Sequence, residues 1–318
     1  MQLAIETVDL TKNYGSLVAV DRLNLRVEKN TIHGFLGPNG AGKSTTIKML
    51  VGLLRPNLGT ARVLGKEVKG DNPLSRQNVG FMPELPRLPK HLKATELLDV
   101  YGRMYGMSEQ RRRAEIPRLI ELVGLKGREQ DLIGKYSKGM QQRMGIAQAL
   151  LGEPELVILD EPSIGLDPVG MVEVRELMKG IAKEGRTVFL SSHLLFEVEQ
   201  TCNNVTIIHH GKILASDTLA NVSGMLHGKP GLRIEVSNLS AGIVNAVKAL
   251  PVVSNVTTDQ NKISVDLNTT SDVRAQVSRE IGRLGGIIVS MSTSTQSLEE
   301  VFVQLVSKSD EGGDPRRA

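Results

Sequence analysis

One segment of the sequence combines glycines, a lysine and a hydroxyl group in a spacing that suits phosphate binding. Residues 37–44 read Gly-Pro-Asn-Gly-Ala-Gly-Lys-Ser and fit the pattern of a glycine, four residues, then Gly-Lys-Ser. Glycines let backbone N–H groups face phosphate oxygens, and the helix expected next adds its positive N-terminal end. Lys43 would reach the β- and γ-phosphates, and the Ser44 hydroxyl would ligate Mg²⁺. The residues expected to bind the nucleotide here are Gly37, Pro38, Asn39, Gly40, Ala41, Gly42, Lys43, Ser44 and Thr45.

Two adjacent carboxylates follow an apolar segment farther along the chain. Leu156–Leu159 is a buried strand by pattern, and Asp160 and Glu161 come directly after it. In α/β sheets, ligands bind at the carboxyl ends of strands. Asp160 would hold Mg²⁺, directly or through water, and Glu161 would accept a proton from an attacking water molecule. The sequence thus predicts a site for hydrolysis of a nucleoside triphosphate.

Alternating strands and helices would position these residues over the first 220 positions. Strands are expected at Ile32–Leu36 and Thr187–Leu190, and Leu23, Leu25 and Val27 alternate as in a half-buried strand. A helix should run from Lys43 to about Leu54, and a mostly helical stretch should cover residues 87–152. The pattern predicts an α/β core with a parallel sheet and a helical subdomain.

Residues 136–143 read Tyr-Ser-Lys-Gly-Met-Gln-Gln-Arg, and Ser137 is a suitable helix N-cap beside exposed N–H groups. With the two motifs above, this segment makes residues 1 to about 220 resemble the nucleotide-binding subunit of ATP-binding-cassette (ABC) transporters, a P-loop NTPase fold. In that family the segment contacts the γ-phosphate of an ATP molecule held by the other subunit, which assigns nucleotide contacts to Ser137 and Gly139. Three positions depart from the usual Leu-Ser-Gly-Gly-Gln form, namely Tyr136, Lys138 and Met140. Lys138 keeps positive charge near phosphate.

The resemblance assigns four further sites. His193 follows the strand Thr187–Leu190 and would contact the γ-phosphate and help Glu161 hold the attacking water. Residues 163–167 resemble the loop that links the two active sites of a cassette pair. Tyr14 lies where the family has an aromatic residue that stacks on adenine, although a core role remains open for this ring. Glu84 stands where most members have a glutamine, and its carboxylate would ligate Mg²⁺.

A second domain is expected after a cluster of glycine and proline residues at positions 221–231. Alternating segments at Leu232–Val236 and Ile263–Leu267 are mixed with two helical patterns, which predicts a small α+β unit of ferredoxin-like type. The predicted limits are residues 1–225 for the ATP-binding domain, 231–306 for the accessory domain and 307–318 for a disordered tail. A stripe of Leu298, Val301, Phe302 and Leu305 predicts a last helix.

Composition narrows the class of protein. The chain has 318 residues, 40% hydrophobic, with a net charge of +4 spread along the sequence, so the charge balance alone does not indicate nucleic acid. One cysteine, Cys202, excludes a disulfide within the chain and fits a reducing compartment. No secretion signal is expected at the start, and no apolar run approaches the ~20 residues of a membrane helix. Action at a membrane would therefore require another chain to cross it.

Taken together, the residues predict an ATPase that binds ATP and Mg²⁺. The resemblance implies a pair of identical or similar subunits, a separate transmembrane permease and a place at the cytoplasmic face of the cell membrane. The C-terminal extension resembles that of the drug- and antibiotic-export branch, which favours export. The alternatives are a soluble ABC ATPase acting on nucleic acid or ribosomes and a regulatory module without turnover. The short interval between the phosphate loop and residue 136 and the presence of Glu161 and His193 argue against them.

Two segments of the predicted helical stretch each allow two interpretations. Arg111–Arg113 is a basic run that suits either a solvated helix face or a lipid or partner contact. Tyr101, Met104 and Tyr105 fall on one helical stripe, which suits either the core of the helical subdomain or the groove where the family docks its membrane partner.

Overall fold

The computed structural model describes residues 2–69, 76–225, 231–269, 271–294 and 298–311. The chain divides into two compact units, Met1–Leu219 with Leu305–Ala318, and Ala220–Gln304.

The first unit is built on a mostly parallel sheet of six strands, in the order β11-β10-β4-β9-β8-β7. Its strands are β4 (Ile32–Leu36), β7 (Val79–Met82), β8 (Leu156–Asp160), β9 (Thr187–Ser192), β10 (Asn204–His209) and β11 (Lys212–Thr218). Every residue of β4, β8 and β9 is buried, as expected for central parallel strands covered on both faces. Only the edge strand β11 runs antiparallel to its neighbour.

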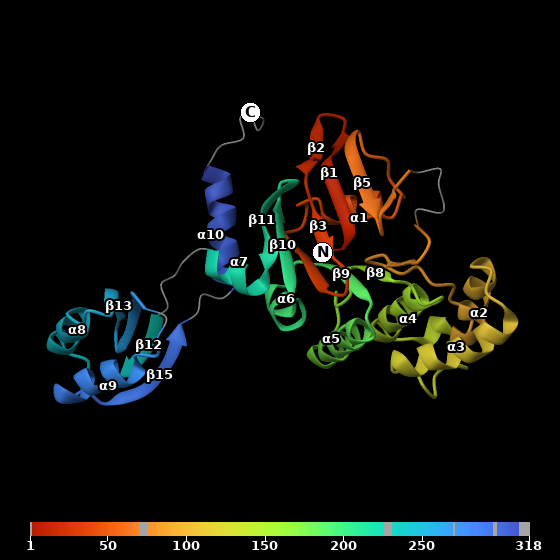
Figure 1. The fold of residues 1–318 in the computed structure, drawn as a ribbon. Coiled ribbons are helices and arrows are strands. Elements are labelled where there is room, and N and C mark those ends of the chain that lie inside the picture. Colours follow the sequence, from red (N-terminus) through yellow and green to blue (C-terminus); the bar gives the residue numbers. More distant parts are fainter. Residues whose placement is uncertain (1, 70–75, 226–230, 270, 295–297, 312–318) are drawn as a thin grey trace. The chain divides into compact units, whose positions relative to one another are not determined.

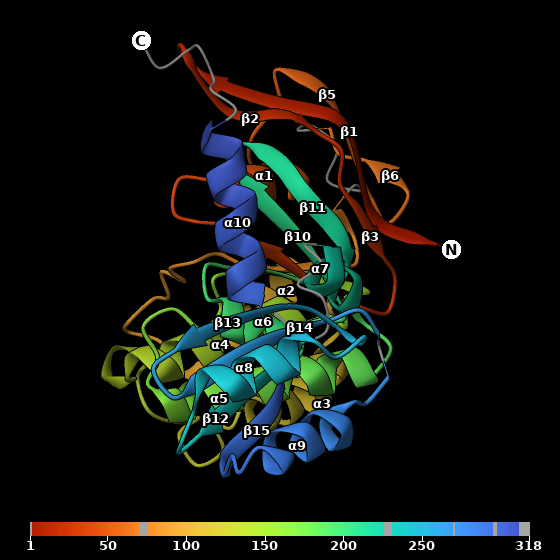
Figure 2. The same ribbon diagram turned by 90° about the vertical axis from the view of Figure 1, so that its left-hand side faces the viewer.

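A second, antiparallel sheet in this unit was not predicted from the sequence. It consists of β1 (Leu3–Tyr14), β2 (Leu17–Leu23), β3 (Arg26–Glu28), β5 (Leu58–Val63) and β6 (Lys66–Glu67). The alternating residues Leu23, Leu25 and Val27 are all buried, but they do not form one strand: Leu23 ends β2, Val27 lies in β3 and Leu25 lies between the two. Helix α1 (Lys43–Leu50) packs on β2, β5 and β8, so it lies between the two sheets (Figure 2). It ends before Leu54 because the chain turns at Gly52, whose φ is +69°.

Helices α2 (Ala94–Met104), α3 (Glu109–Leu122) and α4 (Lys138–Leu150) pack on one another as the predicted helical subdomain, and α4 also contacts β7 and β8 (Figure 1). Helices α5 (Pro168–Lys183) and α6 (Leu195–Thr201) pack on β4 and β9. Close approach of α6 requires Gly34 in β4, because a Cβ there would lie 2.8 Å from Val198 and 3.0 Å from the Cys202 sulfur. Cys202 itself is buried there, where it packs as a small apolar side chain.

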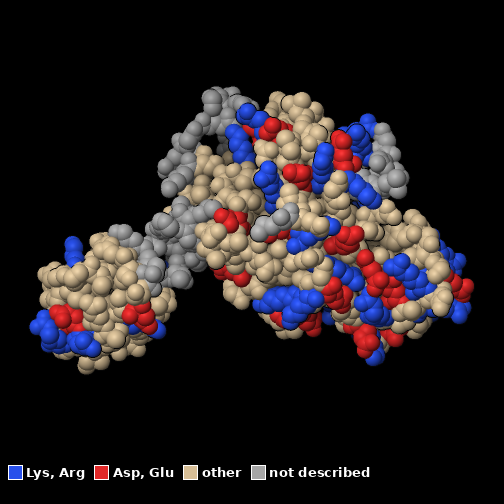
Figure 3. All heavy atoms as spheres, in the orientation of Figure 1, with Lys and Arg blue, Asp and Glu red and all other residues tan. Residues whose placement is uncertain are grey.

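The arginine run and the aromatic stripe of the helical subdomain differ in exposure and pairing. Arg111, Arg112 and Arg113 pair with Glu115, Asp99 and Glu109 respectively, so each contacts a carboxylate of its own subdomain. Met104 and Tyr105 are 72% and 56% exposed, which excludes a core position for them. Lys and Arg side chains intermingle with Asp and Glu over the face shown in Figure 3.

The second unit forms a four-stranded antiparallel sheet in the order β13-β14-β12-β15. Its elements are β12 (Gly231–Val236), α8 (Ala241–Lys248), β13 (Val253–Asp259), β14 (Lys262–Leu267), α9 (Arg274–Arg283) and β15 (Ile288–Ser294). This βαββαβ order with the first strand inside the sheet is the ferredoxin-like arrangement. Strand β13 escaped prediction because only Val253 of its seven residues is buried, so its apolar alternation is weak.

Two helices lie at the ends of the accessory segment. Helix α7 (Leu219–Met225) occupies the start of the expected linker, whereas Gly228 and Pro230 lie outside the described residues. Helix α10 (Leu298–Glu311) carries the predicted apolar stripe and continues past residue 307, and the rest of the expected tail lies outside the described residues. Within the described part of the chain, none of the helices has the length and apolar character needed to span a membrane.

Candidate active site

The loop between β4 and α1 has a backbone that only glycine permits at two places. A Cβ on Gly37 would collide with the carbonyl oxygen of Ile208, and one on Gly42 would lie 2.6 Å from that of Ala19. Gly42 also has φ +106° where it precedes the first turn of α1. The loop therefore keeps its curved path with N–H groups and the N-terminus of α1 at one edge of the sheet, which is the geometry of a phosphate cradle.

Lys43 is the cation of this loop and is almost fully buried. Its Nζ donates hydrogen bonds to the carbonyl oxygens of Gly37, at 2.7 Å, and Pro38, at 3.3 Å. It also lies 3.2 Å from Oε1 of Glu161. A buried ammonium group held this way presents fixed positive charge at the mouth of the glycine loop, where phosphate oxygens would bind.

Glu161 lies at the centre of the polar groups. Its backbone has a positive φ of 50°, which is strained for a residue other than glycine, and its N–H donates to Ser191 Oγ at 3.0 Å. A 2.8 Å hydrogen bond joins its Oε2 to Nδ1 of His193. An ionised carboxylate only accepts hydrogen bonds, so in that state Nδ1 carries the proton and Nε2 of a neutral imidazole is the acceptor. The carboxylate therefore contacts a cation through one oxygen and His193 through the other.

Ser44 and Asp160 are brought together from α1 and the end of β8. The Ser44 hydroxyl donates to Asp160 Oδ1 at 3.3 Å, and the Ser191 hydroxyl donates to the same oxygen at 2.6 Å. Among the described residues no group of three or more His, Cys, Asp or Glu side chains could hold a metal ion. The Ser44 hydroxyl and the Asp160 carboxylate, two oxygen donors, still fit Mg²⁺, because this ion binds through one or two carboxylates and completes its shell with water and substrate phosphates.

An open hollow of about 460 Å³ lies over the loop. Most of the predicted site residues line it: Tyr14, Pro38, Asn39, Gly40, Gly42, Lys43, Ser44, Thr45, Glu84 and Glu161. Tyr14 is 48% exposed and has Lys12 Nζ 5.7 Å from its ring centre, so a core role is excluded. The volume lies in the range of small-molecule pockets, and the polar groups converge at one end of it.

Ser137 and Gly139 stand apart from these residues. Ser137 caps α4 by accepting a hydrogen bond from the N–H of Met140 at 3.3 Å, as predicted. Neither residue lines the hollow. Lys138 at the first turn lies against Gly165, where a Cβ would meet its Nζ. The N-terminus of α4, with Ser137 and Gly139, therefore does not line the nucleotide hollow of its own chain.

Sequence reasoning missed three polar residues near Glu161. Ser191 joins Asp160 to the N–H of Glu161, and the Gln142 amide donates to the carbonyl oxygen of Glu161 at 3.3 Å. Glu197 accepts a hydrogen bond of 2.7 Å from the hydroxyl of Ser163. The pair of serines before His193 was a visible signal for Ser191, whereas the helices that carry Gln142 and Glu197 give no such signal in their sequence pattern.

A parallel sheet with a glycine loop, a buried lysine and an Asp-Glu pair at the carboxyl ends of adjacent strands defines a P-loop nucleoside triphosphatase. A family model described as ABC transporter matches residues 20–164. The bacitracin transport ATP-binding protein BcrA of Bacillus licheniformis is 36% identical over 317 residues, covering 96% of this chain and 98% of the relative. The daunorubicin/doxorubicin resistance ATP-binding protein DrrA of Streptomyces peucetius is 35% identical, over 95% of this chain and 92% of the relative.

A solved structure of the ATP-binding subunit of an ABC transporter superposes with a TM-score of 0.64 at 32% identity, covering 70% of this chain and 93% of that chain. The chain therefore belongs to the ABC transporter family, as one of its ATP-binding proteins. It is an ATP-hydrolysing subunit of a transporter, which confirms the predicted fold class and activity. The alternative of an ATPase acting on nucleic acid gains no support from these relatives.

Proposed function

We propose that the hollow over the glycine loop binds ATP and that Glu161 is the general base of its hydrolysis. The observation that carries the proposal is the position of the Glu161 carboxylate, 3.2 Å from Lys43 Nζ and 2.8 Å from His193 Nδ1. Residues 37–45 would cradle the phosphates, and the ring of Tyr14 would stack on adenine.

Lys43 and Glu161 would exchange partners during the reaction. Phosphate oxygens of bound ATP carry more negative charge than one carboxylate, so they would compete with Glu161 for the Lys43 ammonium. Glu161 Oε1 would then be released to accept the proton of the attacking water, while His193 holds Oε2. Such general-base assistance contributes roughly 10²–10⁴ in rate.

Mg²⁺ would be held by Ser44 and Asp160, with Glu84 as a further carboxylate at the edge of the hollow. When bound, the ion would neutralise charge on the phosphate oxygens. Ser191 orients the Asp160 carboxylate by donating a hydrogen bond to it. In this assignment Asp160 binds the metal ion, Glu161 accepts the proton and Ser191 orients Asp160.

A second ATPase subunit and a membrane-spanning permease complete the proposal. The family resemblance assigns Ser137 and Gly139 to the nucleotide of the partner subunit, and the fact that neither lines the hollow of its own chain supports this assignment. The permease would place the chain at the cytoplasmic face of the cell membrane. Two relatives are described by transport of bacitracin or resistance to daunorubicin, which favours export of such compounds. Residues 1–225 and 231–306 would be the ATP-binding and accessory domains.

Replacement of Glu161 by glutamine tests the proposal. Glu161→Gln keeps the shape but cannot take a proton, so turnover should fall roughly 10²–10⁴-fold. ATP should then accumulate between two subunits, giving a dimer in size-exclusion chromatography with ATP and not with ADP. Lys43→Ala should instead weaken ATP binding about tenfold or more, since the phosphates lose a charged hydrogen-bond donor.

The matched control is Glu299→Gln, at an exposed glutamate of α10. It should hydrolyse ATP at the rate of the unmodified chain. Turnover by Glu161→Gln at that same rate would remove Glu161 from its assigned role. Loss of turnover without an ATP-dependent dimer would keep the base and reject the paired arrangement.

A further inference from the structure

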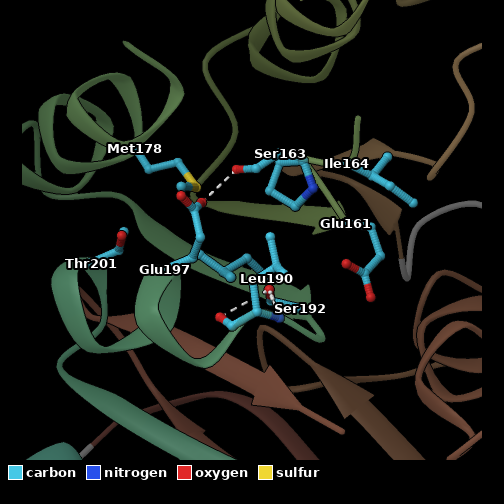
Figure 4. Close-up of a pocket in the computed structure, with 10 residues that line it drawn as sticks. Glu161, Ser163, Ile164, Met178, Leu190, Ser192, Glu197 and Thr201 are labelled. Carbon is cyan, nitrogen blue, oxygen red and sulfur yellow. Dashed lines mark hydrogen bonds between the residues drawn. The ribbon is translucent and has the colours of Figure 1, made fainter. Parts of the chain in front are cut away.

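A buried carboxylate lies behind the candidate active site and does not contact the nucleotide hollow. Glu197 is on α6, four residues after His193, and is only 6% exposed. Its Oε2 accepts a hydrogen bond of 2.7 Å from the hydroxyl of Ser163, two residues after Glu161 (Figure 4). Its Oε1 lies 3.4 Å from a guanidinium nitrogen of Arg175 on α5. Glu197 thus connects the loop after Glu161 to two helices.

These contacts close a ring around the catalytic pair. From Glu161 the chain leads through Pro162 to Ser163, and the hydrogen bond leads on to Glu197. From Glu197 the chain leads back to His193, whose Nδ1 bonds to the Glu161 carboxylate at 2.8 Å. The two hydrogen bonds are the non-covalent links of this ring, and the other links are covalent, so the Ser163–Glu197 contact restricts the distance between His193 and Glu161.

The surroundings make this hydrogen bond strong. Ser163 and Glu197 are both buried, and a hydrogen bond to a charged group in a low-dielectric site is stronger than one in water. The hollow lined by Glu161, Ser163, Thr201 and Glu197 holds only about 10 Å³, roughly the volume that one water molecule needs (Figure 4). No small molecule fits there, so Ser163 and Glu197 bind each other and not a ligand.

We propose that Glu197 is a positioning residue for ATP hydrolysis, acting through Ser163 to hold His193 in hydrogen-bonding range of Glu161. The proposal rests on the assignment of Glu161 and His193 made above. Glu197 touches neither the nucleotide nor water in this scheme. Arg175 pairs with the carboxylate and orients it, and its own guanidinium lies 5.5 Å from the ring centre of Phe196.

The test uses two substitutions that break the same contact from opposite sides. Ser163→Ala removes the donor, and Glu197→Asp shortens the acceptor by one methylene while keeping a charge for Arg175. Each should lower kcat about tenfold and leave ATP affinity within about twofold, because the contact acts after binding. Ser163→Thr, which keeps the hydroxyl, should restore most of the rate, and Ser292→Ala on the exposed strand β15 is the matched control.

A double-mutant cycle separates positioning from general stability. If Ser163 acts through His193, Ser163→Ala should cost nothing further in the His193→Ala chain. Full additivity of the two effects would overturn the proposal, and so would unchanged turnover by Ser163→Ala and Glu197→Asp when Glu161→Gln has lost its turnover. Unchanged turnover by Glu161→Gln itself would instead reject the proposed function on which this inference depends.

Discussion

The two units of the chain differ in whether they bury polar side chains. Among the described residues every buried polar or charged side chain, including Lys43, Asp160, Glu161 and Glu197, lies in the ATPase unit. The buried cluster of the second unit is wholly apolar, and the polar residues of its strands are not buried. Burying charge costs free energy unless each group is paired, so it is retained where chemistry needs it. In the described chain, the buried ionisable groups are therefore concentrated in the unit that carries the candidate active site.

The largest effect should come from removing a core side chain in each unit separately. Phe189 packs its ring on Phe35 at a centroid distance of 5.5 Å, and Ile234 is fully buried in the second unit. Phe189→Ala should cost about 3–5 kcal/mol of stability and Ile234→Ala about 2–5 kcal/mol. Calorimetry should show two transitions, each lowered by its own substitution only. A single transition lowered by both would mean that the two cores unfold together.

Acid should destabilise the ATPase unit selectively. Burial lowers the pKa of His33 from 6.5 to about 4 in the folded chain, where its ring bonds to Thr206 at 2.8 Å. The unfolded chain therefore binds this proton more readily, and the stabilisation present above pH 6.5 is lost as the pH falls through about 4. The loss should approach about 3 kcal/mol.

Unfolding by urea at several pH values measures that loss. His33→Gln should flatten the pH dependence, whereas the exposed His91→Gln should not. The described residues of the second unit contain no histidine, so its transition should not share this dependence between pH 6.5 and 4. An unchanged slope in His33→Gln would contradict the assignment.

The smallest effect is expected from removing the second unit. A chain ending at Met225 should bind ATP within about twofold of the full chain, because all residues assigned to the nucleotide precede that point. A second chain, in which Met225 is joined directly to Leu305, tests the segment that groups with the ATPase unit. Binding by the second chain alone would show that residues 305–318 complete the ATPase unit, and failure of both would reject the separation of the units.

The sequence predicted the residues that bear the chemistry better than the elements that support them. The glycine loop, Lys43 and the Asp160-Glu161 pair could be recognised because spacing along the chain determines their geometry. The strand predicted at Ile32–Leu36 has the bounds of β4, whereas β8 and β9 start where predicted and continue past Leu159 and Leu190 to Asp160 and Ser192. Strand β13 was missed because it lies at the edge of its sheet and buries only Val253, and β1 was missed because its buried and exposed residues do not alternate regularly.

Contacts between distant segments could not be predicted from spacing. Ser163 and Glu197 lie 34 residues apart, and Gln142 lies 19 residues from Glu161. Each of these pairs exists because α4 and α6 pack on particular strands. A single sequence does not predict which face of a helix packs on which strand. Domain limits raise the same difficulty, since Leu305–Ala318 groups with the first unit although it follows the second.

Cys202, the one cysteine of the chain, has a practical consequence. It is buried between α6 and β4, and burial raises its pKa well above the usual range, so the reactive thiolate is scarce at neutral pH. Maleimide fluorophores and nitroxide spin labels should therefore leave the native chain unmarked. A cysteine introduced at the exposed Met104 would carry the label alone, and spectroscopy could follow the helical subdomain without prior removal of the native thiol.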